Sequence, residues 1–519
     1  MLYTNKKREE VKMTQTAERT FLKSLYLNLP KVYFILQILV GIWVSFWLLY
    51  NHQPKTGDDV EHIHSAWLVF QGYVPYQDFF QHHNPLLWYL FAPVVGFFAY
   101  DLAVFDVVRE VSTLVMFFTL FLSGYIVKRF VSCSWYAVLL VVAAAFPSYV
   151  VFSGQDFRPD NYMVTAFMLG LYCFFAYLEQ HKQKQLVLSF FCMFLSFMFM
   201  QKSIFFLALF GAVVIYQLYA KTIKMQDFFN ALLLPVLLAL LFIFWLAYHG
   251  MIERYWLSNF IFNLYIPDVY NGLVEKTHGE FYVLSAIAIT GALYFLIKGN
   301  TCARILSLLM LAESIQRFFY FSLDRHYYYF LLILNAMMAG AAAYELIKRY
   351  NWTAYVFAAL SLWGGVVFRD YCLAYKLAPN YHRYVTPKYV LEQTNKCDSV
   401  LNGYGLTYGL FTKDITYYWN LNGQLDVIGN KIGLAPLPDL DKAVEGYLPK
   451  IIYTGPFWDE RLRKRNIDYP VHWISPELRD KYYEQSLFVD VFILKPEYQQ
   501  QRRCRYDIKT DTWNYYNKG

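Results

Sequence analysis

The chain has 519 residues, of which 57% are hydrophobic, 20% aromatic and only 16% charged. A soluble protein of this length needs more charge to cover its surface, so this composition excludes a soluble globular enzyme or binding domain. The formal net charge of +7 comes from short basic clusters, without the aromatic-interleaved basic stripe expected of a nucleic-acid-binding surface. We therefore expect a polytopic membrane protein with no nucleic-acid partner.

Eleven apolar runs are long enough to cross a hydrocarbon core about 30 Å thick. In chain order they are 32–50, 107–127, 133–152, 161–178, 186–200, 203–220, 228–248, 281–298, 304–321, 327–346 and 352–368. The polar leader before the first run is too long for a cleavable signal peptide, so this run is expected to remain as an anchor.

A further apolar segment, 85–100, could be a span or an interfacial helix. If it does not cross, the main basic clusters all fall on one side of the membrane, which the positive-inside rule identifies as the cytoplasm. These clusters are the N-terminal leader, Lys128–Arg129, Lys182/Lys184, Lys221/Lys224, Lys298/Arg304 and Lys348–Arg349. The rule therefore favours an interfacial or re-entrant helix over 85–100, with the N-terminus inside and the C-terminus outside.

Three parts follow: a cytoplasmic leader (1–31), a transmembrane catalytic domain (32–368) and an extracytoplasmic domain (369–519). Short β-strand patterns predict a small α/β fold for the last part, together with a helix that Ser475 caps and Pro476 begins. The strand patterns lie in 398–405, 450–458 and 486–495. A disulfide could form among Cys372, Cys397 and Cys504, but the spacing leaves the pairing open.

The stretch TGDDVEHIH (56–64) follows the first span and collects three acids and two histidines. It predicts an interfacial helix from Thr56 to about Gln71, with an apolar stripe that could lie on the lipid: Val60, Ile63, Trp67 and Phe70. Acids in a first turn stabilise the helix dipole without any catalytic purpose. Asp59 can serve as the capping acid, however, which leaves Asp58 available as a base.

The same topology brings further charged side chains to the outer membrane boundary. Each cation alone can be explained as an interfacial anchor that snorkels to the headgroups. Their gathering at one face with acidic partners instead indicates a functional site. The residues are Asp156, Arg158 and Asp160 in the second outer loop, Lys202 between two later spans, and Arg325 and His326 late in the chain.

These features follow an order that resembles the GT-C type glycosyltransferases, which take sugars from lipid-phosphate donors. The nearest likeness is to bacterial relatives of the protein O-mannosyltransferases and to the lipid A aminoarabinose transferases. The ordered motifs are the acidic pair Asp58–Asp59, G-x-x-P-Y-x-D-F at 72–79, H-H-x-P-L at 82–86, R-P-D at 158–160, Gln-Lys at 201–202 and R-H-Y at 325–327.

The resemblance implies a fold, a reaction and a set of roles. Asp58 would be the base that activates an acceptor hydroxyl, with Asp59 beside it, and transfer from polyprenyl phosphate would invert the anomeric configuration. The implied donor-phosphate residues are Lys202, Arg325, Arg158 and His326. The implied orienting acids are Asp156 and Asp160, and the implied first-loop contacts are His62, His82 and His83.

Several points stay open at this stage. No cofactor is certain, although Asp58, Asp59, Glu61, His62 and His64 could ligate a divalent metal. The acceptor could be a protein, a glycan or a lipid, and the sugar is undetermined. A transporter or flippase of lipid-linked saccharides, with the acids as a proton relay, is the alternative. Either activity would belong to an integral protein of a bacterial inner membrane.

Overall fold

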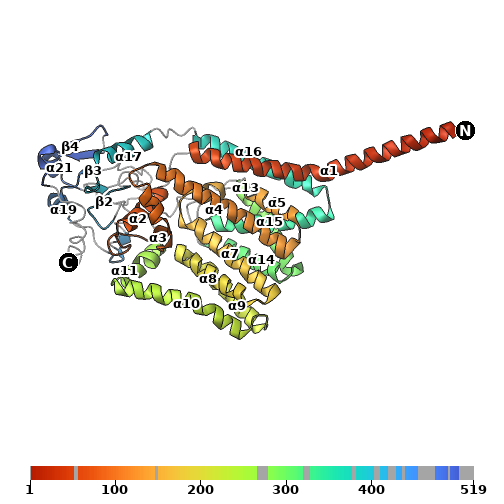
Figure 1. Ribbon diagram of the computed structural model, residues 1–519, viewed down its shortest axis with the longest axis horizontal. Helices are drawn as coiled ribbons and strands as arrows, with labels where there is room; N and C mark the ends of the chain where they lie inside the picture. The colour runs from red at the N-terminus through yellow and green to blue at the C-terminus, as the bar shows by residue number, and fades with distance from the viewer. Residues whose placement is uncertain are drawn as a thin grey trace.

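The structure is a computed structural model, and it shows a long helical bundle with a small sheet-containing domain at one end (Figure 1). It describes residues 2–51, 57–146, 150–265, 279–319, 328–376, 382–402, 410–418, 428–429, 431–434, 439–453, 474–488 and 491–501.

The bundle is built from helices whose positions follow the predicted spans. The helices are α1 (Leu2–Asn51), α4 (Ala103–Val127), α5 (Trp135–Ala145), α6 (Val150–Gln155), α7 (Pro159–Gln180), α8 (Gln183–Phe199), α9 (Ile204–Tyr219), α10 (Met225–Tyr248), α13 (Gly279–Lys298), α14 (Thr301–Phe319), α15 (Tyr329–Arg349) and α16 (Thr353–Lys376). Among the described residues, six segments are long and apolar enough to cross a membrane. The polytopic membrane fold is confirmed, and the count of eleven spans stays a prediction.

Helix α15 lies inside the bundle, and α10 lies at its edge. In α15, 83% of the apolar 18-residue segment is buried, because this helix packs against both α5 and α13. In α10 only 11% of the corresponding 18-residue segment is buried, and leucines such as Leu237 and Leu240 are exposed. Exposed leucines on a bundle helix are expected where lipid is the solvent.

Two shorter helices, α2 (Gly57–Phe70) and α3 (Leu86–Phe97), lie between α1 and α4, in the predicted first outer loop, and pack against each other. The 12 residues of α3 rise about 18 Å, less than the hydrocarbon thickness, which fits the interfacial assignment. The lipid-facing stripe predicted for α2 is wrong. Val60, Ile63 and Trp67 are almost fully buried against protein, and only Phe70 is half exposed.

The C-terminal domain has a five-stranded sheet in the order β2-β1-β3-β5-β4. The strands are β1 (Ser399–Asn402), β2 (Lys413–Asp414), β3 (Ile451–Tyr453), β4 (Tyr483–Gln485) and β5 (Val491–Leu494). Strands β2, β1 and β3 are parallel, and β5 is antiparallel to both of its neighbours. The associated helices are α17 (His382–Gln393), α19 (Leu440–Tyr447) and α21 (Pro476–Tyr482). The three predicted strand regions and the Ser475-capped helix are confirmed.

This domain is docked onto the segment that joins α2 to α3. The Phe80 N–H donates to the Tyr417 carbonyl at 2.8 Å, and the Tyr417 hydroxyl donates to the Tyr76 carbonyl at 2.9 Å. Phe80 also packs in the apolar core of the domain. Helices α2, α3 and α11 (Ile252–Trp256) therefore lie between the bundle and the sheet (Figure 1). The packing at this junction positions α2, which carries some of the charged residues described next.

Candidate active site

Four of the predicted charged residues form a continuous chain of ion pairs. Asp58 pairs with Arg158, Arg158 Nε lies 3.2 Å from Asp160 Oδ2, and Asp160 pairs through its other oxygen with Lys202. Asp58 lies on α2, Arg158 and Asp160 at the start of α7, and Lys202 between α8 and α9. Three segments that are far apart in sequence therefore meet at one end of the bundle.

Local sequence explains where these side chains lie. Pro159 begins α7, a position where its missing N–H costs no helical hydrogen bond. Asp160 is then in the first turn, where the helix dipole stabilises a carboxylate. Lys202 lies in the short 3₁₀ turn Gln201–Ser203, which joins α8 to α9. Asp58 and Lys202 are the accessible ends of the chain, with side chains 29% and 19% exposed, whereas Arg158 and Asp160 are buried.

Asp59 has entirely different surroundings from Asp58. Its Oδ2 accepts from Arg109, with Nη2 at 2.8 Å and Nε at 3.1 Å, and its Oδ1 accepts from the Phe157 N–H at 2.6 Å. Arg109 Nη2 also lies 3.4 Å from Asp156 Oδ1. The Asp59 side chain is fully buried, so this second network ties α2 to α4 and to the loop before α7.

Arg109 is a site residue that the sequence reasoning missed. It lies in the first turns of α4, inside the predicted run 107–127. An arginine inside a membrane span is energetically costly unless it is paired with an acid. Its position in the predicted run could therefore have indicated a buried ion pair. Its actual partners are the two acids, Asp59 and Asp156, that the motif analysis had already singled out.

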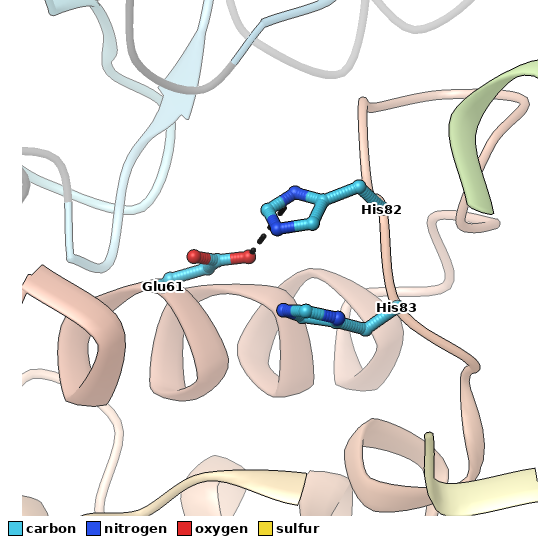
Figure 2. A group of neighbouring side chains, drawn as sticks. All are labelled: Glu61, His82 and His83. Atoms are coloured by element: carbon cyan, nitrogen blue, oxygen red, sulfur yellow. Dashed lines mark ion pairs between the residues drawn. The ribbon is translucent and has the colours of Figure 1, made fainter. Parts of the chain in front are cut away.

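A third group lies one turn further along α2. Figure 2 shows the Glu61 carboxylate facing His82, with His83 on the same side; the Glu61 Oε1 to His82 Nδ1 distance is 4.0 Å. Burial, reinforced by the neighbouring Asp58 carboxylate, raises the pKa of Glu61 to about 8. Burial also lowers the pKa of His82 to about 3 and that of His83 well below its usual range. Both histidines are therefore neutral at physiological pH.

The remaining predicted histidines on α2 make other contacts. The Trp88 indole N–H donates to His62 Nδ1 at 3.1 Å, which assigns the proton of this neutral ring to Nε2. His64 Nδ1 lies 3.0 Å from the Leu410 carbonyl oxygen, to which it donates. The five-residue metal set expected on α2 is consequently divided, because Asp58 and Asp59 pair with arginines and His62 offers no lone pair at Nε2.

Buried amides hold the His82–His83 loop in place. Gln201 Nε2 and Asn263 Nδ2 both donate to the His82 carbonyl, at 2.7 and 2.9 Å. Asn84 accepts from the Tyr255 hydroxyl at 2.7 Å. The loop is thereby fixed to the turn that carries Lys202 and to the segment after α10. Arg325 and His326 lie outside the described residues, so their predicted role in phosphate binding stays a prediction.

No protein-family model and no curated protein matches this chain. Among solved structures, it is similar to ArnT from Cupriavidus metallidurans bound to undecaprenyl phosphate, at 12% identity and a TM-score of 0.56 over 81% of this chain and 92% of that one. The apo form of that protein gives 13% identity and a TM-score of 0.52, with 84% and 94% covered. Archaeal oligosaccharyltransferase AglB from Archaeoglobus fulgidus gives 11% identity and a TM-score of 0.49, with 81% and 69% covered. The membrane fold expected from the motifs, that of the GT-C type transferases, is therefore the fold of this chain.

Proposed function

We propose that this protein transfers a sugar from a polyprenyl-phosphate donor to an acceptor hydroxyl at the outer face of a bacterial inner membrane. The observation that carries the proposal is the chain of ion pairs Asp58–Arg158–Asp160–Lys202, assembled from three segments at one end of the bundle. The fold shared with ArnT, a transferase solved with undecaprenyl phosphate, supports the same donor class.

Asp58 is the proposed base. It is the most exposed acid of the two networks, so an acceptor hydroxyl can reach it, whereas Asp59 is sealed by Arg109 and the Phe157 N–H. Asp58 would accept the hydroxyl proton as the oxygen attacks the anomeric carbon. The bond from that carbon to the phosphate oxygen breaks on the opposite face, which inverts the configuration and releases polyprenyl phosphate.

Lys202 and Arg158 are the proposed partners of the departing phosphate, with Asp160 orienting both. A cation preorganised toward a developing phosphate charge contributes roughly 10²–10³ in rate. Among the described residues the two networks hold four carboxylates and only three cations. An anionic donor therefore needs additional positive charge, and this supports retaining Arg325 and His326 in the proposed phosphate site.

A disulfide bond in the C-terminal domain supports the proposed location of this domain outside the cytoplasm. Cys397 is disulfide-bonded, whereas Cys133, Cys173, Cys192 and Cys302 are free. Disulfides persist in oxidising compartments such as the periplasm, so this bond favours the proposed orientation with the C-terminal domain outside.

Lys202→Met tests the proposal in proteoliposomes supplied with a panel of polyprenyl-phosphate sugars and acceptors. We expect the wild-type protein to transfer one sugar, the variant to lose roughly 10²–10³ in rate, and Lys202→Arg to recover part of it. A flippase would instead move the intact lipid-linked sugar across the bilayer without cleaving it. Undiminished transfer by Lys202→Met, or lipid movement without any cleavage, would contradict the proposal.

A further inference from the structure

We infer that Glu61, His82 and His83 form a binding site for one divalent metal ion of the zinc type, next to the proposed transfer site. One potential ligand atom from each side chain lies within 4.8 Å of the other two. Figure 2 shows the three side chains approaching from two elements, Glu61 from α2 and the histidines from the loop before α3. The inference goes beyond the proposed function and does not depend on it.

Within the part of the chain that the structure describes, three polar atoms of this cluster lack the partners that their burial would normally require. Glu61 Oε1, His82 Nδ1 and His83 Nδ1 are all buried, and none accepts a hydrogen bond from, or donates one to, another described residue. A buried polar atom left without a partner costs about 1–3 kcal/mol, so three in one place call for a ligand. A cation coordinated by the carboxylate and by imidazole lone pairs would satisfy such atoms together.

The geometry is close to that of a loaded site. Zinc ligands in a tetrahedral site lie about 2.0–2.2 Å from the ion, which places them about 3.3 Å from one another. Glu61 Oε1 and His82 Nδ1 lie 4.0 Å apart, and the three potential ligand atoms all lie within 4.8 Å of one another. The side chains would have to draw together by at most about 1.5 Å, which is within the range of small rotations about their χ angles.

The ligand types select the class of metal. Two imidazoles and one carboxylate suit zinc and similar first-row ions, whereas magnesium and calcium prefer oxygen ligands alone. A neutral imidazole coordinates a metal through its unprotonated ring nitrogen. Three protein ligands leave a fourth position for water or another oxygen ligand.

The surroundings hold the ligands in place. The His82 carbonyl accepts from Gln201 and Asn263, and the Tyr76 hydroxyl donates to the His83 carbonyl. Glu61 lies three residues after Asp58 on α2, a spacing that puts both side chains on one helix face. A bound ion would thus add positive charge beside a network in which described acids outnumber described cations.

The test measures metal binding by the full-length protein purified in detergent, without any activity assay. Wild-type protein stripped with a chelator is titrated with Zn²⁺, and the bound metal is determined by elemental analysis. Co²⁺ serves as a second probe, because a four-coordinate site gives strong visible absorption. The variants are Glu61→Gln and His83→Gln. His249→Gln is the matched control, since His249 is also in the outer region but contacts Gln77 instead.

We expect about one tightly bound Zn²⁺ per wild-type and control chain, and at least a tenfold loss of affinity in both variants. Thermal unfolding with and without Zn²⁺ provides an independent reading, because only chains with the site should be stabilised by the ion. Absence of tight binding by the wild type, or equal binding by all four chains, would overturn the inference. A chain that binds zinc but transfers no sugar would leave this site standing and contradict only the proposed function.

Discussion

Asp58 and Asp59 are adjacent in sequence, yet their side chains have opposite surroundings. Asp58 is partly exposed and pairs with Arg158, whereas Asp59 is fully buried between Arg109 and a backbone N–H. The acidic pair therefore combines an accessible carboxylate suited to chemistry with a buried one suited to fixing α2 in place. Substitution of Asp58 should therefore reduce activity, whereas substitution of Asp59 or of its partner Arg109 should reduce stability.

Arg109→Leu should destabilise the protein strongly, because it leaves Asp59 and Asp156 as buried charges without their cation. Removing one member of a buried ion pair typically costs about 3–5 kcal/mol. The matched control is Arg129→Leu, whose pair with Glu179 is more than a third exposed and should contribute at most about 1 kcal/mol. Equilibrium unfolding in mixed detergent measures both. Equal losses of unfolding free energy in the two variants would show that the buried network contributes no more to stability than the exposed ion pair does.

Individual residues were predictable where the cost of placing a charge at a membrane boundary could be read from the sequence. Asp58, Arg158, Asp160 and Lys202 were predictable in this way, and the structure brings them together. Which acid pairs with which cation was not predictable, because the pairing depends on the packing of segments about 40 to 100 residues apart. For the same reason the metal set was placed on α2 alone, whereas the His82–His83 loop supplies two of the three grouped ligands.

Helices α5 and α15 are held together by a close backbone approach at Gly340. A methyl group added there would lie 2.6–2.9 Å from Val141, including its backbone nitrogen and Cα. Backbone atoms in a packed helix cannot move aside cheaply, so the glycine permits the contact between these two helices.

Gly340→Ala should therefore destabilise the bundle by roughly 1–3 kcal/mol, as over-packing does in other cores. A methyl group added at Gly211, in α9, would meet no atom within 4 Å, so Gly211→Ala should be neutral or stabilising by up to about 1 kcal/mol. Thermal unfolding of the two purified variants compares them directly. A Gly340→Ala protein as stable as Gly211→Ala would mean that the α5–α15 contact is looser than described.

Secondary structure at the element scale followed from simple patterns: apolar length for the bundle helices, and Ser475 with Pro476 for α21. Burial did not. The apolar positions of α2 fit lipid and protein equally well, and it is their packing against α3, α4 and residues of the C-terminal domain that makes them face protein. Strands β2 and β4, with two and three residues, are too short for a period-two pattern to identify.

At the scale of the whole molecule, the orientation rests on α3 not crossing the membrane. If it does not, position 101 lies outside and position 182 lies inside. Both residues, Asp101 and Lys182, are exposed in the structure and can carry a reporter.

Asp101→Cys should react with a membrane-impermeant maleimide in intact cells, and Lys182→Cys should react only after the membrane is opened. Both are made in a chain in which exposed Cys133 is replaced by serine, and labelling is scored above that of this parent. The reverse pattern would contradict this orientation and place the end of the bundle that carries the proposed site on the cytoplasmic side.

That the chain is a membrane protein, and its general fold, could be predicted from composition and motif order, because a bilayer allows few kinds of spanning structure. The docking of the C-terminal domain was not, since its contacts join residues over 300 positions apart, such as His64 with Leu410 and Tyr76 with Tyr417. These contacts hold α2, and with it Asp58, at the end of the bundle.

Sugar transfer by Asp58→Asn is the most direct test of the central claim, that the charge network headed by Asp58 carries out the reaction. The measurement is the initial rate in proteoliposomes with the donor and acceptor that the wild-type protein uses, with Asp101→Asn as an exposed outer-loop control. We expect normal insertion and stability for both variants, an unchanged rate for Asp101→Asn, and a rate for Asp58→Asn at or near background. Transfer by Asp58→Asn at the wild-type rate would contradict it.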